Sequence, residues 1–166
     1  VRSIPDFPEE GIIFRDVTSV LQDADGLQLA VSGMQDLIKD IDFDVVVGPE
    51  SRGFIFGCPV AVELGLGFVP IRKPGKLPRE IIKKEYSLEY GTNTLCMHAD
   101  ALKKGDKVVI IDDLLATGGT INAAVDLVRS TGAEVVGCAF LIELTELKGR
   151  ENLEGIKVKA LIDYPY

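Results

Sequence analysis

The chain of 166 residues has one histidine, three cysteines and no tryptophan, and these shortages weaken several classes of site. With His98 as the only histidine, a Ser–His–Asp triad or a metal centre built from imidazoles is poorly supplied. Cys58, Cys96 and Cys138 are far apart and odd in number, so we expect neither a disulfide framework nor a structural zinc site. We interpret these four residues as structural or incidental, and we expect the protein to be cytoplasmic.

Positive charge and long apolar runs are also scarce. Eighteen Lys and Arg residues against 26 Asp and Glu residues give a formal net charge of −8, which argues against general nucleic-acid binding. No uncharged apolar run approaches the ~18 residues of a membrane-spanning helix, and no signal-peptide pattern opens the chain. We expect no membrane or nucleic-acid partner and a single domain over residues 1–166.

The chain does contain alternating strand and helix patterns. This alternation predicts an α/β fold with a mostly parallel central sheet flanked by helices, in which ligands bind at the carboxyl ends of the strands. Three loops, 48–53, 72–92 and 112–120, follow strands at that edge. The strand patterns cover 44–48, 67–71, 94–98, 108–111, 134–144 and 158–162, and helical patterns cover 25–39, 54–65, the segment from 121 to Gly132, and 148–152.

The most informative stretch is VVIIDDLLATGGT, residues 108–120. A buried strand ends in Asp112 and Asp113, and a glycine loop then opens onto a helix. The N-terminus of a helix has unpaired N–H groups and a partial positive charge, so it binds phosphate well. Carboxylates beside such a loop indicate a ligand with hydroxyls, or a bound cation, at one end and a phosphate at the other. A sugar phosphate fits that description.

Two common phosphate motifs fit the chain poorly. Residues 48–53 have the glycine spacing of a Walker A loop, but Phe54 stands where the lysine must be, and no Gly-x-Gly-x-x-Gly follows a strand. A basic cluster at 72–85 instead carries six of the eighteen basic residues, which on an acidic chain indicates an anionic ligand, with a solvated loop as the alternative. Pro74, Gly75 and Pro78 disfavour regular structure where this cluster begins.

The stretch VVIIDDLLATGGT closely resembles the phosphoribosyl pyrophosphate (PRPP) signature of the type I phosphoribosyltransferases. FPEEGIIFRDVT, GPESRGFIFG, RKPGKLP, YSLEYG and ELTELKGRE are similar to segments of the members that act on adenine, so the resemblance covers nearly the whole chain. It implies the type I phosphoribosyltransferase fold, with a small N-terminal hood over about residues 1–18 and a flexible lid loop over about residues 73–92.

The implied reaction transfers the 5-phosphoribosyl group from PRPP to adenine and gives AMP and pyrophosphate in purine salvage. The resemblance also implies a homodimer and Mg²⁺ carried mainly by PRPP, with no direct protein ligand to the metal. Asp112 and Asp113 would face the ribose hydroxyls and stabilise an oxocarbenium-like transition state, and Glu89 would transfer the proton. The remaining roles are phosphate binding for Ala116, Thr117, Gly118, Gly119 and Thr120, pyrophosphate binding for Arg52, Lys73 and Lys76, a partner-subunit contact for Arg72, and adenine binding for Ile13, Phe14, Arg15 and Leu144.

Two alternatives stay open. The chain could act on another purine, hypoxanthine or xanthine, because the choice of base depends on family likeness. It could also be a PRPP-binding regulator without catalysis, which the acidic charge and the intact YSLEYG segment disfavour. The resemblance further implies a cis peptide between Glu50 and Ser51, although the family more often has Asp at position 50.

Overall fold

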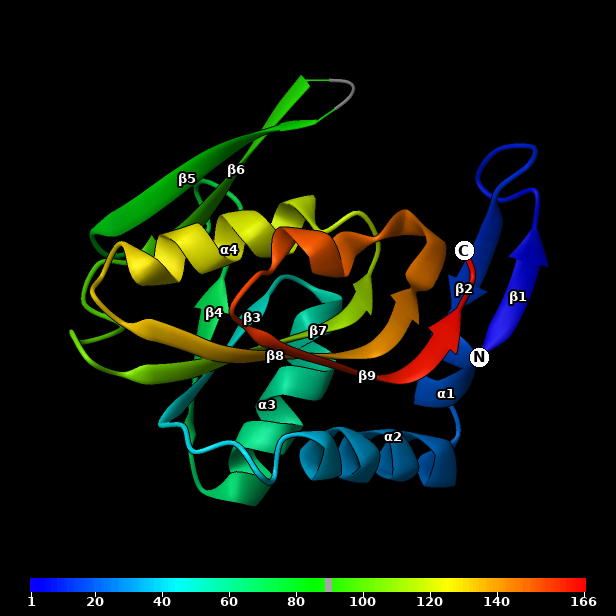
Figure 1. Ribbon diagram of the computed structural model, residues 1–166, viewed down its shortest axis with the longest axis horizontal. Coiled ribbons are helices and arrows are strands. Elements are labelled where there is room, and N and C mark those ends of the chain that lie inside the picture. The colour runs from blue at the N-terminus through cyan, green and yellow to red at the C-terminus, as the bar shows by residue number, and fades with distance from the viewer. Residues whose placement is uncertain (89–90) are drawn as a thin grey trace.

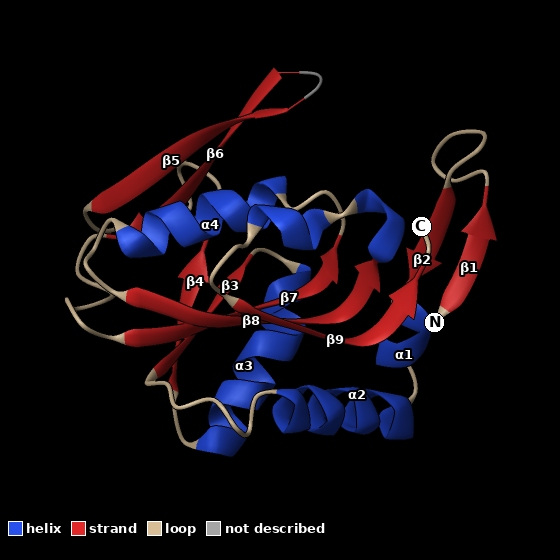
Figure 2. Cartoon of the chain, viewed as in Figure 1, coloured by secondary structure: helices blue, strands red, loops and turns tan. Residues whose placement is uncertain are grey.

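The computed structural model describes residues 1–88 and 91–166 and is built around one five-stranded parallel sheet (Figures 1 and 2). The strand order is β4-β3-β7-β8-β9, which confirms the predicted α/β architecture. Helix α4 covers one face, and helices α2 and α3 cover the other. The bounds are β3 Val45–Pro49, β4 Gly67–Ile71, β7 Lys107–Leu115, β8 Glu134–Leu144, β9 Lys157–Tyr164, α2 Ala24–Leu37, α3 Arg52–Leu64 and α4 Gly119–Arg129.

Strand β7 lies at the centre of the sheet and sets the position of the acidic pair. Its four residues 108–111 are fully buried, because side chains alternate between two covered faces. Val108 and Ile110 pack in the core on the α4 side, whereas Val109 and Ile111 pack in the core on the α2 and α3 side. The apolar run therefore anchors the strand on both faces and leaves its polar carboxyl end at the edge.

The helix boundaries follow local sequence signals. The side chain of Asp23 caps α2 by accepting a 2.9 Å hydrogen bond from the Gly26 N–H. Helix α3 ends at Gly65, whose φ of 71° is left-handed. Helix α4 ends at Arg129, shortly before Gly132, as the sequence predicts. None of the helices in the described ranges is long and apolar enough to cross a membrane.

The predicted lid differs from the expected flexible loop, because much of it belongs to a β-hairpin. Strand β5 (Ile81–Leu88) pairs antiparallel with β6 (Gly91–His98), in a register that runs from Ile81↔His98 to Leu88↔Gly91. Side chains of β5 and β6 pack against the core on the α4 side, which favours strand over loop. Residues 73–80, which hold both prolines, contain no helix or strand, as predicted. The lid is therefore a short irregular segment followed by a hairpin arm.

The N-terminal hood forms a second small sheet. Strand β1 (Arg2–Pro5) pairs antiparallel with β2 (Ile13–Asp16), and helix α1 (Thr18–Leu21) follows. In Figure 1 this hairpin stands beside the carboxyl end of β9 and the C-terminus, whereas the β5–β6 arm stands over α4. The hood and the arm therefore lie apart, the first beside the carboxyl end of β9 and the second over α4.

Candidate active site

A cavity of about 470 Å³ opens at the carboxyl ends of β3 and β7. It brings together two of the three loops that the sequence places at this edge, 48–53 and 112–120. Its walls combine carboxylates, one guanidinium group and a glycine-rich backbone, which suits a polar ligand carrying both hydroxyls and anionic groups. The lining residues are Glu50, Ser51, Arg52, and every residue from Asp112 to Ile121.

The glycine loop, residues 116–120, forms the floor of this cavity and leads into α4. Gly118 adopts a φ of 89°, a conformation that a side chain would strain. The first hydrogen bond of the helix runs from the Asn122 N–H to the Gly118 carbonyl at 2.8 Å. The N–H groups that precede Asn122 in the first turn therefore have no partner within the helix, and they can bind an anion.

The acidic pair occupies the wall beside the glycine loop. Asp113 is 4% exposed, and its Oδ2 lies 2.7 Å from Nε of Arg52. Asp112 is half-buried, and its Oδ1 accepts a 2.8 Å hydrogen bond from the Asp113 N–H. Burial, and then the nearby charge of Asp113, raise the pKa of Asp112 well above its ordinary value. Asp113 is thus paired with a cation, whereas the surroundings of Asp112 disfavour its charged form.

Glu50 connects the cavity to the start of the lid. The Glu50–Ser51 peptide is cis, as the resemblance implies. Glu50 Oε1 accepts a 2.7 Å hydrogen bond from the Lys73 N–H, and the Arg72 guanidinium lies 3.4 Å away. The Lys73 N–H hydrogen bond, followed by the charges of Arg72 and Lys76, lowers the pKa of Glu50. The backbone of Lys73 thus contacts Glu50, which lines the cavity. The predicted pyrophosphate residues Lys73 and Lys76 are not themselves lining residues.

The hairpin arm contacts the glycine loop. The hydroxyl of Tyr86 lies 3.2 Å from that of Thr120, and Lys84 Nζ lies 3.5 Å from Asp126 Oδ2 on α4. These contacts place β5 along α4, from Thr120 in its first turn to Asp126 near its C-terminal end. Glu89, the predicted proton-transfer residue, lies outside the described residues.

The predicted adenine residues lie outside the lining of this cavity. Ile13, Phe14 and Arg15 are on β2, where the Phe14 ring packs edge-on against Phe7 at a centroid distance of 5.2 Å. Arg15 donates a 2.6 Å hydrogen bond to the Tyr166 carbonyl, and its guanidinium lies 4.1 Å from the centre of the Tyr164 ring. Leu144 ends β8 and packs with the core on the α2 and α3 side.

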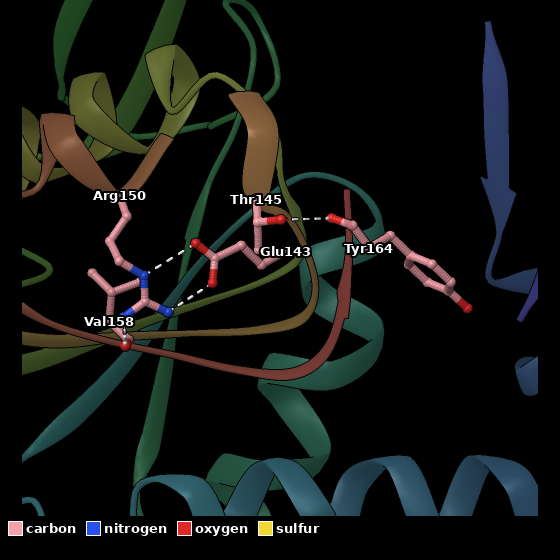
Figure 3. A network of polar contacts seen from close by, with 5 residues as sticks. All are labelled: Glu143, Thr145, Arg150, Val158 and Tyr164. Atoms are coloured by element: carbon pink, nitrogen blue, oxygen red, sulfur yellow. Dashed lines mark hydrogen bonds and ion pairs between the residues drawn. The ribbon is translucent and has the colours of Figure 1, made fainter. Parts of the chain in front are cut away.

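A polar network beside the glycine loop was not foreseen in the sequence. Arg150 forms two hydrogen bonds with Glu143, at 3.0 and 2.7 Å, and a third with the Val158 carbonyl at 2.7 Å (Figure 3). Asn152 Nδ2 donates a 2.8 Å hydrogen bond to the Thr117 carbonyl. The segment ELTELKGRE contains Glu143 and Arg150, and its resemblance to the family was the one signal that could have pointed to them.

Comparison with known proteins places this geometry in context. Residues 17–162 match the family model described as the phosphoribosyl transferase domain. An adenine phosphoribosyltransferase from Lachnoclostridium phytofermentans is 60% identical over 164 residues, which cover 99% of this chain and 94% of that protein. The crystal structure of adenine phosphoribosyltransferase from Thermoanaerobacter pseudethanolicus has a TM-score of 0.95 at 51% identity, covering 99% of this chain and 95% of that one.

A second solved structure contains ligands. Adenine phosphoribosyltransferase from Saccharomyces cerevisiae, complexed with an imino-altritol bisphosphate and adenine, has a TM-score of 0.89 at 38% identity. The match covers 96% of this chain and 93% of that chain. Likeness at these identities extends over the central sheet, the hood and the hairpin arm together.

Proposed function

The chain belongs to the phosphoribosyl transferase family and, within it, to the adenine phosphoribosyltransferases, and from this membership we propose that it transfers the 5-phosphoribosyl group of PRPP to adenine. The products are AMP and pyrophosphate. The observation that carries the proposal is that Asp112 and Asp113 line the same cavity as the glycine loop. One end of that cavity suits a phosphate and the adjacent wall suits sugar hydroxyls.

The glycine loop is the proposed site of the ribose 5′-phosphate. The N–H groups of the first turn of α4 and the hydroxyls of Thr117 and Thr120 can donate hydrogen bonds to its oxygens. Gly118 and Gly119 allow the backbone to approach the phosphate closely. With the phosphate held here, the ribose ring lies over Asp112 and Asp113, which accept hydrogen bonds from its hydroxyls.

The reaction breaks the bond between C1′ and the pyrophosphate oxygen and forms a bond from C1′ to N9 of adenine. Positive charge develops on the ribose as the leaving group departs, and fixed carboxylates stabilise that charge without reorganising. The N9 proton of adenine must leave, and Glu89 is the proposed acceptor. Closure of the lid would exclude water from the activated sugar, which would otherwise be hydrolysed.

The leaving pyrophosphate needs positive charge, which Arg52, Lys73 and Lys76 are proposed to supply. Arg52 is oriented by its ion pair with Asp113, yet half of its side-chain surface stays exposed. In residues 1–88 and 91–166, no group of three or more His, Cys, Asp or Glu side chains is arranged to hold a metal ion. Mg²⁺ is proposed to be held mainly by PRPP oxygens and water, where it offsets the charge of the diphosphate.

Selectivity for adenine is proposed to lie in the hood. Backbone groups of Ile13, Phe14 and Arg15 would read the purine edge, and Phe14 or Leu144 would pack on the ring. Donors and acceptors matched to a 6-amino purine are left unpaired by a 6-oxo purine, so the wrong base binds weakly. An enzyme for hypoxanthine or xanthine is the alternative that a competition assay would reveal.

A homodimer is proposed as the working form, with Arg72 contacting the partner subunit. The exposed face of α3 supports this proposal, because it carries two apolar side chains, Val62 at 70% and Ile55 at 36% exposure, on a helix whose residues are mostly apolar. Sedimentation at several concentrations of the wild type and of Val62→Glu would test it, since a charge on this face should favour monomer. The cysteines Cys58, Cys96 and Cys138 are free, which suits a cytoplasmic enzyme.

The decisive experiment measures AMP formation from adenine and PRPP with Mg²⁺. Guanine, hypoxanthine and xanthine serve as competing bases, and PRPP without base serves as the control for hydrolysis. We expect AMP and pyrophosphate in equal amounts, with adenine strongly preferred. Binding of PRPP without AMP formation from saturating adenine would overturn the enzymatic proposal in favour of a regulator.

A further inference from the structure

The strap, residues 145–152, links β8 to β9 through two short 3₁₀ turns, η1 (Thr145–Leu147) and η2 (Gly149–Asn152). We propose that Asn152 is a positioning residue for the ribose 5′-phosphate, held in place by Gly149 and Arg150 of the same strap. The inference rests on the proposed function in one respect only, namely that the glycine loop binds this phosphate.

Asn152 acts on the peptide between Thr117 and Gly118. Its side-chain N–H donates to the Thr117 carbonyl at 2.8 Å. In a trans peptide the carbonyl and the following N–H point in opposite directions. A Thr117 carbonyl turned toward the strap therefore turns the Gly118 N–H toward the opposite side. Asn152 thus fixes one donor of the glycine loop in the orientation that an anion in the cavity requires.

Close backbone packing keeps the strap against the glycine loop. A Cβ added to Gly118 would lie 2.7 Å from the Gly149 carbonyl oxygen, closer than real Cβ atoms approach. A Cβ added to Gly149 would likewise collide with the Ala116 carbonyl. Position 149 needs glycine because of this close approach. Its backbone conformation does not require glycine, since its φ is not left-handed. The two backbones can touch only because both positions are glycine.

Arg150 fastens the strap to the sheet. Its guanidinium binds both carboxylate oxygens of Glu143 on β8 and the Val158 carbonyl on β9 (Figure 3). The Glu143 side chain is 8% exposed, so the pair is shielded on the carboxylate side. Planar two-point pairing of this kind fixes direction as well as distance. The position of Asn152 is therefore set by the sheet itself, through an element whose residues do not line the cavity.

Two substitutions separate positioning from folding. Asn152→Ala removes the donor, and Asn152→Asp keeps the size but presents a carboxylate to the Thr117 carbonyl. Glu151→Ala is the matched control, because Glu151 is an exposed neighbour in the same turn whose side chain forms no hydrogen bond within residues 1–88 and 91–166. Because the Asn152 hydrogen bond lies at the surface, we expect thermal unfolding of all three variants to stay within a few degrees of the wild type.

The kinetic test compares the KM values of the two substrates. We expect the KM for PRPP to rise ~5- to 20-fold in Asn152→Ala and at least as much in Asn152→Asp, with the KM for adenine changed less than ~2-fold. Glu151→Ala should match the wild type. An equal rise in both KM values, or an unchanged KM for PRPP in both Asn152 variants, would overturn the proposal.

A binding measurement keeps this inference separable from the proposed function. Calorimetric titration with ribose 5-phosphate needs no turnover, and we expect the affinity to fall ~5- to 20-fold in Asn152→Asp. If the wild type forms no AMP but this difference appears, the proposed reaction fails and the positioning role stands. If the wild type forms AMP and Asn152→Asp binds ribose 5-phosphate as tightly as wild type, the positioning role is refuted.

Discussion

The glycine loop contacts the strap through Asn152 and through the close approach of Gly118 to Gly149. The β1–β2 hairpin of the hood contacts the C-terminal residues Tyr164 and Tyr166 through Arg15. All four residues of β1 are exposed, and those of β2 are only half-buried. The difference teaches how one site can combine two demands. The proposed phosphate end is rigid and preorganised, while the proposed base end can adjust around its ligand.

The largest effect should come from the rigid end. Asp113→Asn keeps the shape of the side chain but removes its negative charge and the ion pair with Arg52. We expect kcat/KM to fall by about 10²–10³ whichever base is used, because fixed charge at a transition state contributes on this scale. Steady-state kinetics with adenine and with the best alternative base would measure the loss. A loss confined to one base would contradict a general role in ribosyl transfer.

The strap can be loosened without touching the cavity. Arg150→Met leaves the Glu143 carboxylate buried and unpaired, so we expect the free energy of unfolding to fall by about 2–3 kcal/mol in urea. Because about half of the Arg150 side chain is exposed, this loss of stability is smaller than for a fully buried ion pair. The double variant Glu143→Leu with Arg150→Met removes both charges and should cost less than Arg150→Met alone. If the double variant is the less stable of the two, the cost does not come from an unpaired charge.

The adjustable end predicts a different pattern. Phe14→Ala removes an aromatic ring that packs against Phe7 on the hood. We expect the KM for adenine to rise about tenfold, as loss of one base–aromatic stack would give, with the KM for PRPP and the thermal midpoint nearly unchanged. The mirror image of this pattern is the one expected for Asn152. A rise in the KM for PRPP instead would mean that the two ends are coupled.

The smallest effect concerns the acidic pair and pH. The raised pKa of Asp112 means that the folded state binds its proton more tightly than the unfolded state, for which the ordinary value is 3.8. The resulting stability is present below that value and is lost as the pH rises through the folded pKa. Asp112→Asn should therefore raise the free energy of unfolding by roughly 1 kcal/mol at neutral pH while lowering activity.

Urea unfolding of wild type and Asp112→Asn at several pH values checks the sign. The stability difference should shrink as the solution is made more acidic, because protonation removes the penalty from the wild type. Asn at this position can still accept the Asp113 N–H hydrogen bond. If the wild type instead loses stability toward acid relative to Asp112→Asn, the carboxylate is stabilising.

What the sequence predicts best is local. Strands β4 and β8 have the predicted bounds, since each is a continuous run whose ends carry glycine or a change to polar residues. The glycine loop was found because its residues are adjacent. The Arg52–Asp113 and Arg150–Glu143 pairs were missed, because they depend on which chain segments the fold brings together.

The hairpin arm and the hood show two different limits of prediction. The lysines and glutamate of IIKKEYSL obscure strand β5, which pairs with β6. The adenine residues, like Lys73 and Lys76, are not among the residues that line the cavity. Their position relative to the glycine loop depends on how the hood sits against the C-terminus. Polar composition thus limits the prediction of β5, whereas distance in the sequence limits the prediction of how the hood is placed.

The outer edge of β4 has a consequence for how copies of this chain can assemble. The Ile71 carbonyl accepts a hydrogen bond from Glu50 N–H on the β3 side, whereas Arg72 exchanges two hydrogen bonds with Cys96 on the other side. Because backbone groups alternate along a strand, Pro70 faces outward, where its missing N–H cannot template another strand. At the opposite edge, β9 carries Lys157 and Lys159. Both edges of the sheet therefore resist edge-to-edge pairing with a second copy of this chain.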